Sequence, residues 1–87
     1  MKMLTKKMNE TLNAIYEAGA ARASDLWDGT RTVSAIDGML VRAVAKGLLR
    51  WEGVEIDGRN VGAAILTEDG RIAVEAYRAR LVIEEAD

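Results

Sequence analysis

The stretch from Thr30 to Trp51 constrains the fold of this chain most, because it combines a helix start, an apolar stripe and a helix stop. A hydroxyl at Thr30 or Thr32 can cap the helix, and Gly47 can take the left-handed conformation that ends one. Between them, apolar residues recur at the intervals of one helix face packed on a core. They are Val33, Ile36, Leu40, Val44 and Leu48. The pattern predicts a helix over residues 30–47, followed by an extended segment.

Two shorter helices are expected before this one. The first begins after Thr5, carries apolar residues on one face and stops at Gly19. Ser24 is expected to cap a very short second helix, in which Leu26 and Trp27 are apolar anchors. A turn at Asp28-Gly29 separates it from the long helix. A short helix, a tight turn and a long helix are typical of a helix-turn-helix.

The spacing of the apolar residues changes after Gly47 from that of a helix to that of a strand. Leu49, Trp51, Val54 and Ile56 approach the alternation of a strand, and a bulge at Gly53 would account for the shift in register. Asp57-Gly58 is a strong signal for a two-residue hairpin turn, since both residues tolerate positive φ. The return strand alternates at Val61, Ala63 and Ile65. The sequence therefore predicts a hairpin over residues 50–66.

A final helix is expected after Thr67, with Ile72, Ala76, Ala79 and Ile83 on its apolar face and Tyr77 and Leu81 widening that face. The predicted fold class is α+β, mainly α: a winged helix made of helix, short helix, recognition helix, hairpin wing and C-terminal helix. Residues 1–87 are expected to form a single domain. The predicted core is Leu12, Ile15, Val33, Ile36, Leu40, Val44, Leu48, Ile65 and Ile72.

Two motifs within this order resemble those of MarR-like winged-helix regulators. Lys46-Gly47-Leu48-Leu49-Arg50 resembles the K-G-L-[VL]-R that closes their recognition helix, and Leu66-Thr67-Glu68-Asp69-Gly70-Arg71 resembles their L-T-x-x-G-[RK] junction after the wing. Leu4-Thr5 with Leu12 and Ile15 resembles their opening helix. The resemblance spans nearly the whole chain. It implies a winged-helix fold and, as in that family, a small regulator of transcription that binds duplex DNA.

The sequence departs from the family in two respects. MarR-type proteins usually extend beyond both ends of this core with dimerisation helices, which are missing or much reduced here. The Asp-x-Arg signature of their wing is only partly matched by Asp57-Gly58-Arg59. The resemblance therefore implies the fold more strongly than it implies a regulator that responds to a ligand.

The resemblance also implies where DNA would be read, because in the family the first half of the recognition helix meets base edges and the wing meets the backbone. Arg can bond a guanine edge or a phosphate, and Ser and Thr can reach either. A small side chain at Ala35 would let the helix approach the groove closely. The predicted DNA-binding residues are Arg31, Thr32, Ser34, Ala35, Arg42, Arg50, Arg59 and Asn60.

Several of these residues have a purely structural interpretation. In that interpretation Thr32 is only a helix cap, Arg42 is one half of a surface ion pair, and Asn60 is a turn residue. Gly38 suits a helix–helix packing site better than a groove contact. Trp27 and Trp51 are expected in the core, although a Trp at the base of the wing can also face a partner.

Charge is the main argument against DNA. The formal net charge of the 87-residue chain is −2, and residues 22–60 hold six basic and six acidic residues. Asp37 lies on the recognition helix and Asp57 at the wing tip, where phosphates would repel them. The alternative is therefore a winged-helix protein-interaction module that does not bind DNA.

Enzymatic activity is not expected, because the chain has neither a P-loop nor a dinucleotide fingerprint. With no Cys and no His, we predict neither a metal site nor a cofactor. No apolar run is long enough to span a bilayer, which favours a cytoplasmic protein without a membrane partner. The excess of apolar residues on the final helix predicts a homodimer formed through the terminal helices.

Overall fold

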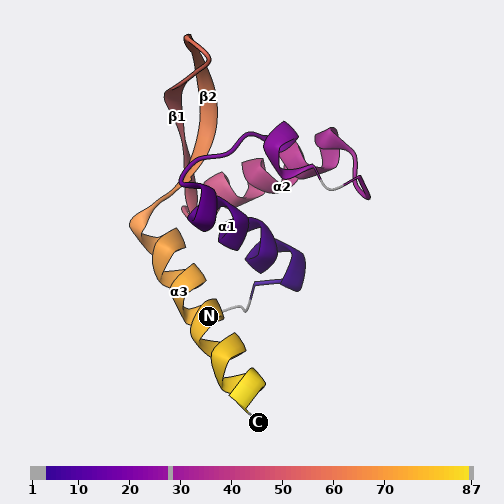
Figure 1. Cartoon of the computed structure of the whole chain (residues 1–87), viewed down its shortest axis with the longest axis vertical. Coiled ribbons are helices and arrows are strands. Elements are labelled where there is room, and N and C mark those ends of the chain that lie inside the picture. The colour runs from indigo at the N-terminus through magenta and orange to yellow at the C-terminus, as the bar shows by residue number, and fades with distance from the viewer. Residues whose placement is uncertain (1–3, 28, 87) are drawn as a thin grey trace.

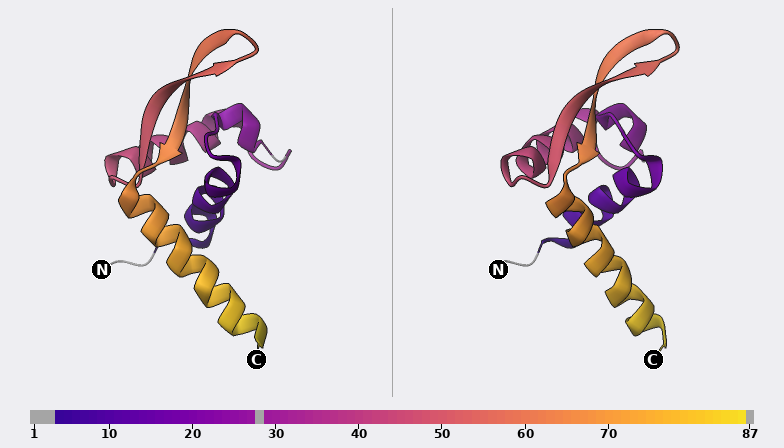
Figure 2. Two further views of the ribbon diagram at one scale, coloured as in Figure 1. Left: turned by 60° about the vertical axis from the view of Figure 1, so that its left-hand side comes forward. Right: turned by 90° about the vertical axis from the view of Figure 1, so that its left-hand side faces the viewer.

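The computed structural model describes residues 4–27 and 29–86, and its elements follow the expected order (Figure 1). They are α1 (Lys6–Ala18), the 3-10 helix η1 (Ala23–Leu26), α2 (Val33–Ala45), β1 (Leu49–Ile56), β2 (Arg59–Leu66) and α3 (Glu68–Ala86). The hairpin projects away from α1 and α2, and α3 leads off in the opposite direction (Figure 2). The prediction of a mainly helical α+β winged helix is confirmed.

The helix caps of α1 are those expected from the sequence. The Thr5 hydroxyl accepts a hydrogen bond from the Met8 N–H at 3.2 Å, which satisfies one of the free donors of the first turn. Gly19 ends the helix with φ of 87°. Met8, Leu12 and Ile15 are buried on one face, as predicted.

The short helix η1 differs from the prediction at both ends. It starts after Arg22 rather than at Ser24, because the Asp25 carboxylate reaches back and accepts from the Arg22 N–H at 2.9 Å. This hydrogen bond, together with the Arg22 guanidinium, lowers the pKa of Asp25. Leu26 packs against the core as expected, whereas Trp27 is 59% exposed, so its expected role as an apolar anchor is wrong.

Thr32, not Thr30, caps α2, and its hydroxyl accepts from the Ala35 N–H at 3.1 Å. At the other end Gly47 takes φ of 76°, and the Leu48 N–H donates to the Ala43 carbonyl oxygen at 3.0 Å. This is a Schellman ending, which lets the chain turn directly from the helix into β1. The helix itself therefore covers less than the predicted residues 30–47, since Thr30 and Arg31 precede its cap and Lys46 and Gly47 follow its last residue.

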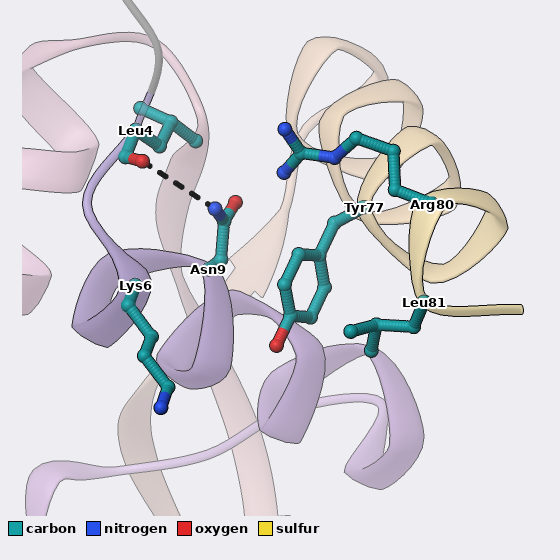
Figure 3. Close-up of a pocket in the computed structure, with 6 residues that line it drawn as sticks. All are labelled: Leu4, Lys6, Asn9, Tyr77, Arg80 and Leu81. Carbon is teal, nitrogen blue, oxygen red and sulfur yellow. Dashed lines mark hydrogen bonds between the residues drawn. The ribbon is translucent and has the colours of Figure 1, made fainter. Parts of the chain in front are cut away.

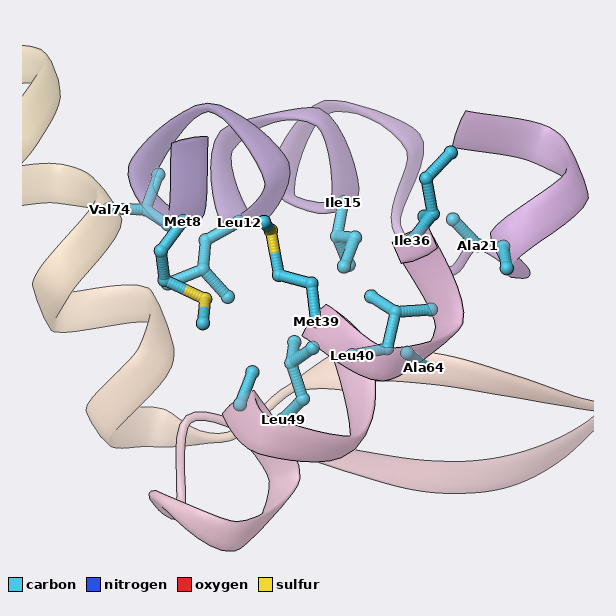
Figure 4. Close-up of a cluster of buried hydrophobic side chains, with 12 residues drawn as sticks. Met8, Leu12, Ile15, Ala21, Ile36, Met39, Leu40, Leu49, Ala64 and Val74 are labelled. Atoms are coloured by element: carbon cyan, nitrogen blue, oxygen red, sulfur yellow. The ribbon is translucent and has the colours of Figure 1, made fainter. Parts of the chain in front are cut away.

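The buried face of α2 is rotated relative to the predicted stripe. Val33 is 44% exposed, because it is the first helical residue and lies ahead of the part that packs on the core. Val44 and Leu48 are only half-buried at the other end. The residues that enter the core with α1, β1 and β2 are spaced three and four apart (Figure 4). They are Ile36, Met39, Leu40 and Ala43.

The hairpin turns at Asp57-Gly58, as predicted, with φ of 52° and 76°. Its register is regular from Leu49↔Leu66 to Ile56↔Arg59, so the bulge expected at Gly53 is wrong. Gly53 lies directly opposite Gly62, and the two glycines continue the ladder without an extra residue. Trp51 is 44% exposed on this ladder, so its expected core position is wrong.

A short bridge that the sequence did not predict joins the chain after α1 to the wing. Ala21 and Ala64 exchange two backbone hydrogen bonds, of 3.0 and 2.8 Å. Both alanines are buried, and small side chains allow the two segments to approach. The bridge fixes the base of the hairpin relative to α1 and η1.

The face of α3 that packs on the core was predicted wrongly. Ile72 is 58% and Ile83 65% exposed. The helix instead buries Gly70 and Val74 and half-buries Tyr77, because its first turn is held against the end of α2. The Thr67 hydroxyl accepts from the Gly70 N–H at 3.1 Å and donates to the carbonyl oxygen of Gly47, at the end of α2, at 2.6 Å.

Candidate nucleic-acid interface

The first half of α2 offers small and polar side chains to solvent. Thr32, at the cap, and Ser34 and Ala35, in the first turn, are all exposed. Thr32 already uses one lone pair of its hydroxyl as the helix cap, but its O–H can still donate. With no long side chain at Ala35, the backbone of this turn can come close to a flat or grooved partner.

Arg31 stands at the start of this surface and is half-buried. Its Nη1 lies 3.9 Å from the Sδ of Met39, so part of the side chain rests on the core residue below it. It forms no ion pair with any carboxylate in the described residues 4–27 and 29–86. The guanidinium therefore keeps donors available for another acceptor.

Arg42 lies further along α2 and is exposed. A Cβ added at Gly38 would lie 3.8 Å from the Arg42 Nη1 and would meet no other described side chain and no neighbouring element. The interpretation of Gly38 as a helix–helix packing site is therefore wrong. Arg42 has no ion-pair partner in the part of the chain that the structure describes, so the ion-pair interpretation is also wrong.

The predicted polar residues of the wing differ in whether they already contact another residue of the chain. Arg50 lies 3.4 Å from the Glu52 carboxylate, in a pair in which both side chains are half exposed or more. Arg59, at the tip, is exposed and unpaired among the described carboxylates. The Asn60 amide folds across to the opposite strand, where a Cβ on Gly53 would lie 2.7 Å from its Oδ1. Gly53 thus makes room for Asn60.

The predicted site residues therefore occupy two surfaces. One is the start of α2 with the two residues before it, and it carries Arg31, Thr32, Ser34 and Ala35. The other is the hairpin, which carries Arg50, Arg59 and Asn60, while Arg42 lies further along α2. Exposed carboxylates share both surfaces. They are Asp37 on α2 and Glu52, Glu55 and Asp57 on the hairpin.

Solved structures show the same arrangement of helices and wing. Apo MarR from E. coli matches with a TM-score of 0.72 at 24% identity, over 84% of this chain and 54% of that chain. A MepR-like protein complexed with pseudoligands matches with a TM-score of 0.67 at 29% identity, over 83% of this chain and 51% of that chain. A probable transcriptional regulator from Pseudomonas aeruginosa matches with a TM-score of 0.73 at 27% identity, over 95% of this chain and 64% of that chain. This chain has a MarR-like winged-helix fold.

The chain spans between 51% and 64% of the length of these structures. No protein-family model matches the sequence, and comparison with curated proteins gives no significant match. The MarR-like fold is thus evident from the three-dimensional arrangement, at a sequence identity of 24–29%. Within the described residues, no helix is long and apolar enough to cross a membrane.

Several residues discussed above line hollows in the described part of the chain. One, of about 700 Å³, is an apolar groove between the end of α2 and the first half of α3, lined by Leu48, Ile72, Ala73 and Ala76 among others. A second, about 220 Å³, lies between α1 and α3, where the Tyr77 ring, Arg80 and Leu81 face Lys6 and Asn9 (Figure 3). The third, about 340 Å³, lies between α1 and the segment before α2.

Sequence reasoning did not find the third hollow, although one local signal was present. Lys6 and Lys7 occupy the first turn of α1, the positive end of the helix dipole, where acidic residues are favoured. Arg31 joins them from a segment more than twenty residues away in sequence. Only the packing of α1 on α2 brings the three together.

Proposed function

We propose that this chain is a winged-helix transcription regulator that binds duplex DNA with α2 and the hairpin. The observation that carries the proposal is the set of arginines without a carboxylate partner among the described residues. Arg31, Arg42 and Arg59 lie on the surfaces that a winged helix offers to DNA. Likeness to apo MarR and to a probable transcriptional regulator supports it.

In this proposal each surface has its own task. Ser34 and Ala35 face base edges in the major groove, and Thr32 and Arg31 contact a base or the adjacent backbone. Arg59 and Asn60 at the wing contact phosphates or the minor groove. Arg50 contributes less, since Glu52 already neutralises it. The location we propose is the cytoplasm of a prokaryote, with a chromosome, plasmid or phage as the source of the DNA.

The carboxylates on both surfaces limit how tightly one copy can bind. Non-specific affinity for DNA comes mainly from the neutralisation of its phosphates by basic side chains. The carboxylates of Asp37 and Asp57 repel phosphates and so lower that affinity. Two copies bound to one site would double the number of favourable contacts. We therefore include a homodimer in the proposed function.

The dimer is proposed to form through α3. Ile72, Leu81, Val82 and Ile83 expose between 37% and 66% of their surface, and the apolar groove of about 700 Å³ adjoins the first of them. Exposed apolar side chains that gather on one element commonly mark an interface. A two-fold dimer would use this surface once from each copy and present two α2 helices.

Light scattering at micromolar concentration tests the dimer. We expect a dimer for the full chain and a monomer after removal of the residues that follow Ala79. Val82→Asp is a milder variant that leaves the helix length unchanged and adds a charge to the proposed interface. A monomer at all concentrations, or a dimer that neither change weakens, contradicts the proposed interface.

DNA binding is tested by selecting bound sequences from a random duplex pool at low ionic strength. Arg31→Ala is expected to weaken the selected site more than random sequence, by about 1–3 kcal/mol. Arg59→Ala is expected to weaken both and to reduce the salt slope by about 1. Arg71→Ala removes an exposed α3 arginine and serves as the matched control.

A protein-interaction module without DNA binding is the second candidate. Two observations favour it: the even charge of residues 22–60 and the exposure of Trp27 and Trp51, at 59% and 44%. Aromatic residues are enriched at protein interfaces. Failure to select any sequence at low salt, or binding that does not depend on salt, would replace the regulator with this candidate.

A further inference from the structure

The hollow between α1 and the segment before α2 is lined almost entirely by polar side chains. Its volume is about 340 Å³, within the size range of small-ligand sites. Lys6, Lys7 and Glu10 line it from the first two turns of α1. Thr30 and Arg31 line it from the segment that leads into α2.

The charge of this hollow is strongly positive for a chain whose net charge is −2. Lys6, Lys7 and Arg31 form no ion pair with any described carboxylate, and the ion pairs that the structure describes all lie elsewhere. Glu10 is the one carboxylate among the described lining residues. The first turn of α1 holds no acidic residue, so the positive end of its dipole adds to the two lysines instead of being offset.

Both walls of the hollow contact one buried residue, Met39. Met39 of α2 is 9% exposed, and its Sδ lies 3.9 Å from the Arg31 Nη1. The Thr11 hydroxyl of α1 lies 3.1 Å from the same sulfur and donates to the Lys7 carbonyl oxygen at 2.8 Å. The Thr11 hydroxyl, which is hydrogen-bonded to the Lys7 carbonyl oxygen, and the guanidinium of Arg31 therefore contact the same sulfur.

We propose that this hollow binds a phosphate group. Among the described lining residues, three cations opposed by one carboxylate favour a ligand with more than one negative charge over a simple carboxylate. Arg31 supplies a planar fork that fits two phosphate oxygens, and Lys6 and Lys7 supply compact point charges beside it. The nearby end of the α1 dipole stabilises the same charge.

The phosphate has two possible sources. Arg31 immediately precedes Thr32, the cap of α2, so a backbone phosphate of DNA seated near this turn would reach the hollow. A small phosphorylated molecule is the other source, and it would occupy the same cations at the edge of the proposed DNA surface. The site does not rest on the proposed DNA binding, because its first test uses no DNA.

The first test is calorimetric titration of the full chain with pyrophosphate. We expect saturable binding that Lys6→Gln/Lys7→Gln weakens roughly ten-fold, through loss of two charge-assisted contacts. Lys46→Gln/Arg71→Gln removes two exposed charges elsewhere and is expected to leave the affinity unchanged. Glu10→Gln is expected to tighten binding by about two- to five-fold, because it removes the opposing carboxylate. All of these side chains are exposed, so the variants are expected to remain folded.

The second test identifies the source by the salt dependence of binding to a selected duplex. If DNA supplies the phosphate, Lys6→Gln/Lys7→Gln lowers the salt slope by about 1–2 while the matched control does not. In that case pyrophosphate also competes with the duplex. If a small molecule supplies the phosphate, the lysine variant keeps the wild-type salt slope for the duplex, and the changes in pyrophosphate affinity remain.

The proposal is overturned in either of two ways. In the first, pyrophosphate shows no saturable binding, and the lysine double variant does not change the salt slope of duplex binding more than its matched control does. The other is an equal loss in the two double variants, which would reflect overall charge alone. A chain that binds no DNA but binds pyrophosphate in the expected order of variants would refute the proposed function and support this site.

Discussion

Gly70→Ala tests how α3 is attached to the rest of the chain. Gly70 is buried in the first turn of α3, where a Cβ would collide with the carbonyl oxygen of Leu48. The same Cβ would lie 3.0 Å from the Leu48 carbonyl carbon and 3.1 Å from the Leu66 Cδ2. Because two of these atoms are backbone, a side-chain rotation cannot relieve the contact. The first turn of α3 must move instead.

Two effects of opposite sign compete in this variant. Helix propensity alone favours Ala over Gly by about 1 kcal/mol. Overpacking a filled site costs about 1–3 kcal/mol, and more when backbone must shift. The hydrogen bond that the Thr67 hydroxyl accepts from the Gly70 N–H, at 3.1 Å, and the one it donates to the Gly47 carbonyl oxygen, at 2.6 Å, would be strained by the same shift. We therefore expect a net loss of stability.

Gly38→Ala is the matched control, because it makes the same change within a helix. A Cβ at Gly38 meets only the Arg42 Nη1, at 3.8 Å. Propensity then acts alone, and the variant is expected to gain about 0.5–1 kcal/mol.

Thermal unfolding followed by circular dichroism measures both variants. The midpoint is expected to shift by about 4–8 °C per kcal/mol for a domain of this size, downward for Gly70→Ala and upward for Gly38→Ala. A midpoint for Gly70→Ala at or above that of the wild type would show that α3 does not approach Leu48 as described.

Three further predictions concern the core, the end of α2 and the cap of η1. Leu40→Ala removes a side chain with 0% exposure and is expected to lower the free energy of unfolding in urea by about 2–5 kcal/mol. Val41→Ala, at 52% exposure, is expected to change that free energy little. Equal effects would mean that α2 faces the other way. Gly47→Ala places a Cβ at φ of 76° and is expected to cost about 1–2 kcal/mol by the same measurement. Asp25→Asn tests the lowered pKa: the wild-type hydrogen bond stabilises the chain above the unfolded-state pKa of 3.8 and is lost as pH falls through the lower folded value. The wild type should therefore lose more stability than Asp25→Asn between pH 7 and acid; parallel losses would contradict the assignment.

The helix caps and the wing turn were predictable from sequence because each depends on neighbouring residues. Thr5 and Thr32 accept hydrogen bonds from N–H groups three residues ahead. Gly47 and Asp57-Gly58 occupy conformations with positive φ. None of these features requires a distant contact, so their order alone gave the winged helix.

The rotation of the helices could not be predicted in the same way. The sequence of α3 holds apolar residues on several faces, and periodicity does not say which of them meets the core. That is decided by Gly70, which closely contacts Leu48, a residue between α2 and β1 and more than twenty positions earlier in the sequence. Val74 and Gly70 then turn inward, and Ile72 is left outside. The Ala21–Ala64 bridge was missed for the same reason, since it joins segments distant in sequence.

The candidate site was predictable as a set of residues, but not in its charge. Counting residues 22–60 gives equal numbers of acids and bases, which weakens the DNA proposal. Ion pairing leaves that balance even but alters where the remaining charges lie, because the structure pairs Arg22 with Asp25 and Arg50 with Glu52. The cations that remain unpaired among the described residues include Arg31, which lies beside two lysines of α1. The positive potential is therefore expected to be greatest at the start of α2, where a winged helix meets DNA, and weaker along the hairpin.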